Sequence, residues 1–179
     1  MREIYEVKPL EGYLPEIAVW LWAMAEARQK TKAYTEGISQ DVLDWAGPEG
    51  GENSIGTLLY HLAAVEMGWL YGDILEQPFP EKDFPVPGEM QGRLTPVPGV
   101  ALDDHLARLD RCRAVFLEKM QGMTLEDWSR LRYPAGEDYA VSPAWAVFHL
   151  VEHEAGHAAQ IGVMKKRARA ALLRSGRAL

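Results

Sequence analysis

Eleven prolines divide the 179-residue chain into stretches that can and cannot form long helices. Proline removes a backbone hydrogen-bond donor and breaks helix interiors. Four windows contain none: residues 16–47, 49–77, 99–133 and 144–179. Residues 78–98, in contrast, hold six prolines, which predicts an extended connection. The chain is therefore predicted to form a long helix in each window, with one long crossover between the second and third helices.

Apolar residues recur every three or four positions in the first two windows, as in amphipathic helices. The first helix is expected to carry Glu16 in its first turn and to end near Gly37, followed by a loop with a short turn over residues 42–45. The second should begin after Ser54, which is a good N-cap, and continue to about Leu75.

The third helix is expected to run from about Val100 to Gly122, with a short capped turn at Thr124. Ser142 as cap and Pro143 at the first helical position predict the start of the fourth. Strand-like alternation is weak throughout. The pattern predicts an all-α protein, a four-helix bundle formed by one domain over residues 1–179.

Charge and composition exclude several classes of protein. The net charge of −7 argues against nucleic acid as the main partner, because phosphate binding depends on Lys and Arg. One cysteine excludes a disulfide framework. The longest uncharged runs, 53–65 and 139–151, have 13 residues, too few to cross a membrane. With no signal-peptide core at the N-terminus, a cytoplasmic protein is expected.

Three of the five histidines, His149, His153 and His157, follow one another at four-residue spacing on the fourth predicted helix. Each such step advances about 40° around the axis, so the three share one face. His61 lies on the apolar stripe of the second helix. Two imidazoles from one helix and one from a facing helix can hold a zinc, nickel or iron ion with open positions. His105 is expected to be solvated or at the boundary of the core, and Cys112 to pack as a small apolar group.

His153 to His157 also spell H-E-x-x-H, a metalloprotease signature. Such a protease takes its third ligand downstream and works beside a sheet, whereas residues 158–179 contain no His, Asp or Glu. We therefore treat the protease motif as a coincidence. Glu154 lies 100° around the helix from His153 and is expected either to face solvent or to serve as a base or hydrogen-bond partner.

Two segments resemble the DinB-like family. The first is Ser54-Ile55-Gly56-Thr57-Leu58-Leu59-Tyr60-His61-Leu62, and the second runs from Ser142-Pro143-Ala144-Trp145 through the three histidines to Gln160-Ile161. The similarity extends over about residues 14 to 170. It implies an up-down-down-up bundle, often a homodimer, and a divalent metal held by His61, His153 and His157. In place of the Arg-Gly pair common in the family, this chain has Ala158-Ala159.

The resemblance also implies chemistry, because characterised members include S-transferases and an isomerase that use low-molecular-weight thiols. The leading hypothesis is a metal-dependent enzyme of small molecules that transfers such a thiol cosubstrate. A hydrolase that activates water and a non-catalytic metal-binding bundle are the alternatives. A fourth protein ligand from Glu66, Asp73 or His149 would favour the non-catalytic reading. Further site positions are expected around the metal or in a pocket: His149, Glu154, Gln160, Tyr60 and Trp69.

Overall fold

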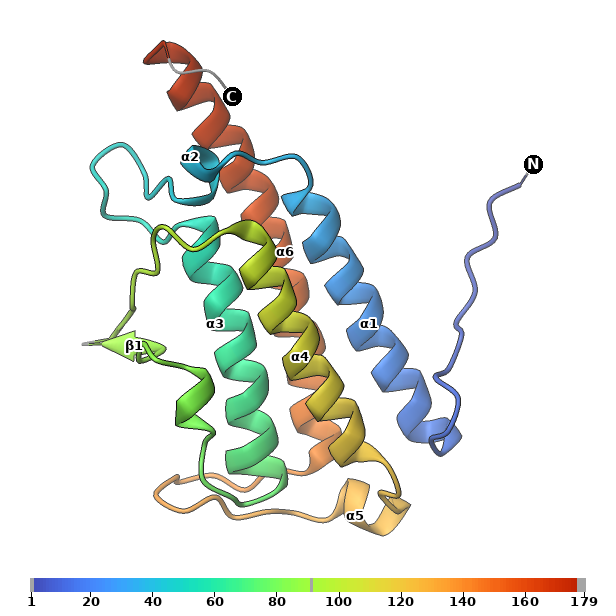
Figure 1. Ribbon diagram of the computed structural model, residues 1–179. Coiled ribbons are helices and arrows are strands. Elements are labelled where there is room, and N and C mark those ends of the chain that lie inside the picture. The colour runs from blue at the N-terminus through green and yellow to red at the C-terminus, as the bar shows by residue number, and fades with distance from the viewer. Residues whose placement is uncertain (1, 91, 177–179) are drawn as a thin grey trace.

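Four long helices run side by side in the computed structural model, which describes residues 2–90 and 92–176 (Figure 1). They are α1 (Pro15–Thr35), α3 (Ile55–Gly68), α4 (Leu102–Met120) and α6 (Pro143–Arg174). In Figure 1, α1 and α6 run upward and α3 and α4 run downward. The expected up-down-down-up four-helix bundle is therefore confirmed.

The predicted caps explain where several helices begin. The hydroxyl oxygens of Ser54 and Ser142 accept hydrogen bonds from the backbone N–H groups three residues on. Thr124 does the same at the start of the short helix α5 (Leu125–Ser129). Each bond satisfies one of the donors that a helix start leaves without an intrahelical partner. Pro143 follows its cap at the first helical position, where proline is well tolerated.

The Pro-rich crossover returns the chain from the lower end of α3 to the upper end of α4 (Figure 1). It contains a short 3-10 turn η2 (Glu81–Asp83) and an antiparallel pair of two-residue strands, β1 (Glu89–Met90) and β2 (Arg93–Leu94). The loop between α1 and α3 holds the single-turn helix α2 (Gln40–Leu43). Because the crossover spans the bundle, α4 can lie parallel to α3.

The lower end of α3 widens into a π-helical turn, η1 (Trp69–Ile74). There the Leu75 N–H donates to the Leu70 carbonyl five residues back, at 2.9 Å. The sequence predicted a continuous helix to about Leu75, and the chain is helical that far. The wider turn rotates the side chains that follow it, and such turns are frequent at functional sites.

The core lies between α1 and α6 on one side and α3 and α4 on the other. Trp20 of α1 is 36% exposed, and its ring packs edge-on against Phe148. One expectation about burial is wrong. His105, expected near solvent, is 0% exposed. Cys112 is buried, as predicted. Within the described residues, no helix is both long and apolar enough to cross a membrane.

Candidate metal centre and its cavity

Three imidazole rings converge between α3 and α6. The Nε2 atom of His153 lies 3.0 Å from Nε2 of His61 and 3.2 Å from Nε2 of His157. All three side chains are half-buried. Nitrogens that bind one ion at about 2.1 Å lie roughly 3.0–3.4 Å apart. The spacing of the rings is therefore the spacing of a metal-ligand set.

Gln160 orients one of these rings. Its side-chain oxygen lies 3.0 Å from Nδ1 of His157, which assigns the ring proton to Nδ1 and leaves the Nε2 lone pair facing the other rings. A neutral imidazole has one donor, so the Nε2 proton of His153 can serve only one of its two neighbours. The other close pair of nitrogens then has no proton directed along the line between them. A cation between them removes this conflict.

Burial favours the neutral form of these histidines. Burial, with a smaller contribution from the neighbouring histidines, lowers the pKa of His61 to about 4 and that of His153 to about 3. The pKa of His157 is also lowered by burial, against its hydrogen bond to the Gln160 oxygen, which raises it. Neutral imidazole is the form that coordinates metals. At neutral pH all three rings are therefore in the ligating state.

The three side chains considered as a fourth ligand are engaged elsewhere. Glu66 pairs with two arginines, and Asp73 accepts a hydrogen bond from the Tyr139 hydroxyl at 2.7 Å. His149 lies flat against the Trp145 ring, 5.3 Å between centroids. Among the described residues, His61, His153 and His157 are the one group of His, Cys, Asp and Glu side chains close enough to share an ion. An ion held by these three rings alone would have coordination positions left for water or substrate.

Glu154 does not face solvent, which corrects one of the sequence expectations. It points into the core, where one charged residue from each long helix meets the others: Arg28, Glu66, Arg113 and Glu154. Arg28 bridges the two carboxylates, at 2.6 Å to Glu66 and 2.5 Å to Glu154. Arg113 bridges them again, at 2.7 Å and 3.1 Å. Glu154 is thus the structural partner of arginines, and H-E-x-x-H here lacks the exposed base of a protease.

The four charges cancel, which is what makes their burial tolerable. Burial alone would raise the pKa of the Glu66 carboxyl, but Arg113 and Arg28 outweigh it and hold that pKa below its usual value. Arg28 also donates to the Leu109 carbonyl at 2.8 Å. The network therefore ties the four helices together next to the histidines, since Glu154 follows His153 in sequence.

A cavity of about 870 Å³ opens beside His61. One side of α3 and η1 forms its floor, and the crossover and the loop before α6 form its walls. Trp69, a predicted pocket residue, lines it. The other residues that line it are Ala64, Val65, Gly68, Gly72, Asp73, Glu76, Gln77, Pro78, Phe79, Gly88, Glu89, Tyr133, Pro134, Ala135, Glu137 and Tyr139.

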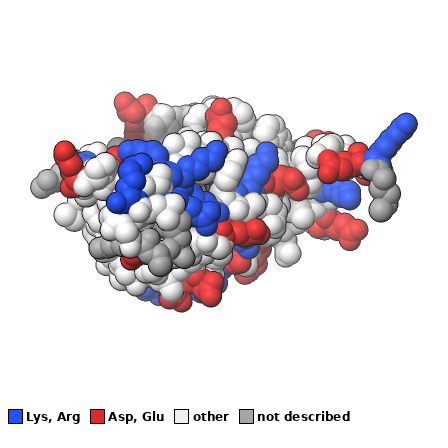
Figure 2. Space-filling view, turned by 90° about the horizontal axis from the view of Figure 1, so that it is seen from above, with Lys and Arg blue, Asp and Glu red and all other residues white. Residues whose placement is uncertain are grey.

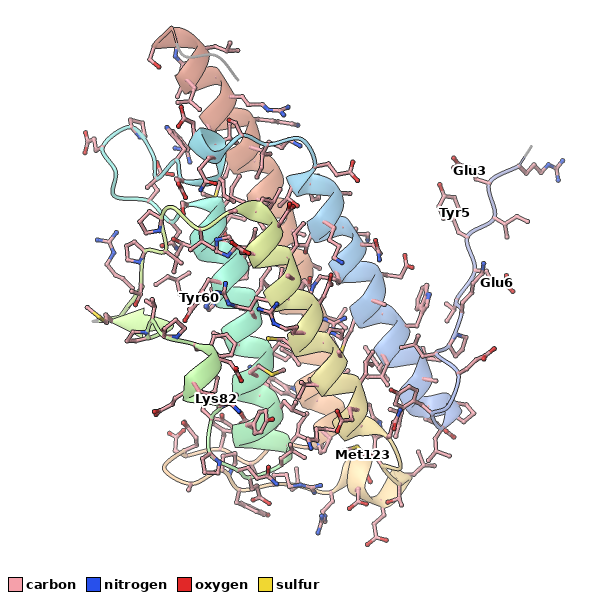
Figure 3. All side chains as sticks on the ribbon, in the orientation of Figure 1. Glu3, Tyr5, Glu6, Tyr60, Lys82 and Met123 are labelled. Atoms are coloured by element: carbon pink, nitrogen blue, oxygen red, sulfur yellow. The ribbon has the colours of Figure 1, made fainter. Side chains whose placement is uncertain are left out.

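Tyr60, the other predicted pocket residue, lies outside this cavity. It points from α3 toward the crossover (Figure 3), and its hydroxyl donates to the Val86 carbonyl at 2.6 Å. His149 packs against the rings of both Trp69 and Trp145, and its centroid lies 5.8 Å from that of His153. The tryptophans thus fix the turn of α6 that precedes the metal-ligand set.

The basic residues at the end of α6 have structural partners. Figure 2 shows Lys and Arg side chains gathered over this end of the bundle, with acidic side chains around them. Lys165 and Arg169 donate to the carbonyls of Glu36 and Gly37, just beyond α1, and Arg167 pairs with Glu52 at 2.6 Å. These contacts hold the α1–α2 loop and the α2–α3 loop against α6.

Sequence reasoning missed the charge network and the role of Tyr139. A signal for the network was present, because each of its members interrupts an apolar helical stripe. Arg28 follows Leu21 and Met24 at helical spacing, and Glu154 lies between Leu150 and Ala158. A charge at such a position predicts a buried ion pair. Tyr139 lies in a loop and carries no comparable periodic signal.

Comparison with known proteins supports the family that the sequence motifs resemble. A family model described as the DinB superfamily matches residues 23–161. Among solved structures, the chain is similar to YfiT from Bacillus subtilis, at 20% identity and a TM-score of 0.59, over 92% of this chain and 94% of that one. That protein is described as a probable metal-dependent hydrolase with an unusual four-helix bundle topology. A search of curated proteins finds no match. The match of the family model over most of the chain shows that the protein belongs to the DinB superfamily.

Proposed function

We propose that His61, His153 and His157 hold one divalent metal ion and that the protein is a metal-dependent hydrolase of small molecules. The convergence of three Nε2 atoms, 3.0 and 3.2 Å apart, carries this proposal. The donor set fits such an ion, because it is neutral, half-buried and without a carboxylate or thiolate that would close it. When bound, the ion supplies Lewis-acid chemistry, which acidifies water and polarises a substrate carbonyl.

The residues of the chain have distinct roles in this proposal. Gln160 holds the His157 ring so that Nε2 faces the site, as outer partners of metal ligands commonly do. The cavity beside His61 binds and orients the substrate. The charge network keeps α3 and α6 at the separation that the three rings require, since Glu66 and Glu154 share both arginines.

Hydrolysis is favoured over thiol transfer by the charge of the cavity. Four carboxylate residues line it, Asp73, Glu76, Glu89 and Glu137, and no Lys or Arg appears among its described lining residues. Thiol cosubstrates that carry carboxylates of their own would be repelled there. Thiol transfer remains the second candidate, for a neutral or cationic thiol, because three neutral imidazoles leave the ion its full charge to bind a thiolate.

The test is a set of activity assays on metal-free protein loaded in turn with zinc, nickel and iron. We expect hydrolysis of small esters or amides by at least one loaded form, and its loss in His153→Ala. The His149→Ala variant is the matched control for metal binding, since it removes a histidine from the same helix face that lies outside the converging set. Thiol transfer to an electrophile is measured in parallel.

The outcomes separate the candidates. Hydrolysis that requires both metal and His153 supports the proposal. Metal-dependent thiol transfer without hydrolysis would replace it by the second candidate. Binding of metal without either activity, across a broad panel of substrates, would contradict an enzymatic role and favour a non-catalytic metal-binding bundle.

A further inference from the structure

The cavity beside His61 carries negative charge that the protein leaves uncompensated. Of the acidic residues that line it, Asp73, Glu76, Glu89 and Glu137, none forms an ion pair within the described part of the chain. Arg132 is close in sequence to the residues that line the cavity, but its guanidinium donates to the carbonyls of Ile74 and Arg130 and forms no ion pair with these carboxylates. The cavity therefore lacks a counter-ion of its own.

The lack of a counter-ion is most unfavourable at Asp73, because this carboxylate is buried. Its residue is only 9% exposed, and within the described chain the Tyr139 hydroxyl is its one side-chain hydrogen-bond donor, which reaches Oδ1. Burial raises the pKa of the Asp73 carboxyl, and Glu137 adds to this, whereas the hydrogen bond from Tyr139 and the nearby His149 ring lower it without cancelling the rise. A buried carboxylate without a cation is unfavourable, so a cationic ligand at Oδ2 would be stabilised.

Aromatic rings flank the same carboxylate. Trp69 and Tyr139 both line the cavity, with centroids 6.3 Å apart, and the Tyr139 hydroxyl touches Asp73. Aromatic faces together with a carboxylate are the usual surroundings of bound ammonium groups. The end of the cavity formed by η1 therefore combines the two features that recognise an organic cation.

A groove connects this end to the histidines. Ala64, Gly68 and Gly72 follow one another at four-residue spacing along its floor, and a Cβ added at Gly68 or Gly72 would meet no atom within 4 Å. His61 and Asp73 are twelve positions apart along α3 and η1, which corresponds to roughly 15–18 Å of helix. A ligand that reaches both must be elongated.

We propose that this cavity binds an elongated small molecule whose cationic end, a protonated amine or a quaternary ammonium, lies between Asp73, Trp69 and Tyr139. Its other end then lies at His61. The inference rests on the proposed metal centre only for the position of the reacting group. Recognition of the cation depends only on the residues that line the cavity.

Three probes of nearly the same shape and different charge test the proposal: 4-phenylbutylammonium, 4-phenylbutan-1-ol and 4-phenylbutyrate. Their affinities for the full chain, stripped of metal with a chelator, are measured by isothermal titration calorimetry at pH 7. We expect the ammonium to bind about tenfold more tightly than the alcohol, and the carboxylate to bind most weakly.

Variants locate the effect. Asp73→Asn should reduce the affinity for the ammonium to that of the alcohol while leaving the affinity for the alcohol nearly unchanged. Glu16→Gln, which removes an exposed charge on α1, is the matched control and should keep the preference. Gly72→Leu should weaken all three probes, because the side chain would fill the groove.

Equal affinities for the three probes, tighter binding of the carboxylate, or a preference that survives Asp73→Asn would overturn the proposal. Unchanged binding in Gly72→Leu would place the probes outside the groove and overturn it as well. Because the titrations use metal-free protein, a failed metal centre leaves the preference for the cation intact. Conversely, if the protein binds a metal but does not prefer the ammonium probe, cation recognition by the cavity is refuted and the proposed metal centre is not.

Discussion

Four individual residues form a buried charge network in the core, one from each long helix: Arg28, Glu66, Arg113 and Glu154. Removing one of them leaves its partners buried without compensation. We expect Arg28→Met to lower the free energy of unfolding by about 3–5 kcal/mol. Urea unfolding measures this loss, and Lys32→Met is the control. That variant breaks the partly exposed ion pair with Asp110 and should lower the free energy of unfolding by less than about 1 kcal/mol. Equal losses would contradict the role assigned to the network.

His105 gives the protein a dependence on acid that is separate from the histidine site. Burial lowers its pKa to about 4, and neither ring nitrogen has a hydrogen-bond partner within the described residues. In the unfolded chain this histidine takes up a proton near pH 6.5, whereas in the folded protein it does so only near pH 4. The free energy of unfolding therefore falls as the pH drops from about 6.5 toward 4. The loss amounts to about 3 kcal/mol.

The pH dependence of the free energy of unfolding checks this assignment in His105→Leu. The variant should lose less stability than the wild type between pH 6.5 and 4, because one titrating group has been removed and the others are common to both. Parallel curves for the two proteins would show that His105 is not the group responsible.

At the scale of the element, α6 offers two glycines that differ only in their surroundings. A Cβ at Gly162 would lie 3.0 Å from Cε1 of Tyr34 on α1, whereas one at Gly156 would meet nothing within 4 Å. Both alanine substitutions gain the same helix propensity, about 1 kcal/mol. Gly156→Ala should therefore stabilise the protein, and Gly162→Ala should be less favourable by about 1 kcal/mol or more.

Thermal or urea unfolding of both variants measures this difference, and the Tyr34→Ala background tests its cause. With the ring removed, the two substitutions should become equivalent. If Gly162→Ala remains the less favourable change without Tyr34, the close approach of α1 and α6 at this point is not the reason.

Prediction from sequence succeeded for these elements because their signals are local. Helix period, the proline-free windows and the Ser54 and Ser142 caps depend on residues a few positions apart. The four-residue spacing of His153 and His157 placed them on one face by the same logic. It failed where the environment comes from other elements. Glu154 meets arginines of α1 and α4, and His105 is covered by residues distant in sequence.

Topology determines the site at the scale of the whole molecule. The crossover makes α3 and α4 parallel, and the bundle then brings His61 of α3 against His153 and His157 of α6 (Figure 1). The cavity is closed by the crossover and by the loop before α6, segments without periodic patterns. For this reason the histidines were predictable and the cavity was not. Formation of a homodimer stays a prediction.

The metal content of the protein, purified without an affinity tag, tests the central claim most directly. We expect about one divalent ion per chain in the wild type and in His149→Ala, measured by mass spectrometry after incubation with zinc, nickel and iron. His153→Ala should lose the ion, because one of the three converging nitrogens is gone. A wild type that takes up no ion, or a His153→Ala variant that keeps it, would contradict the account.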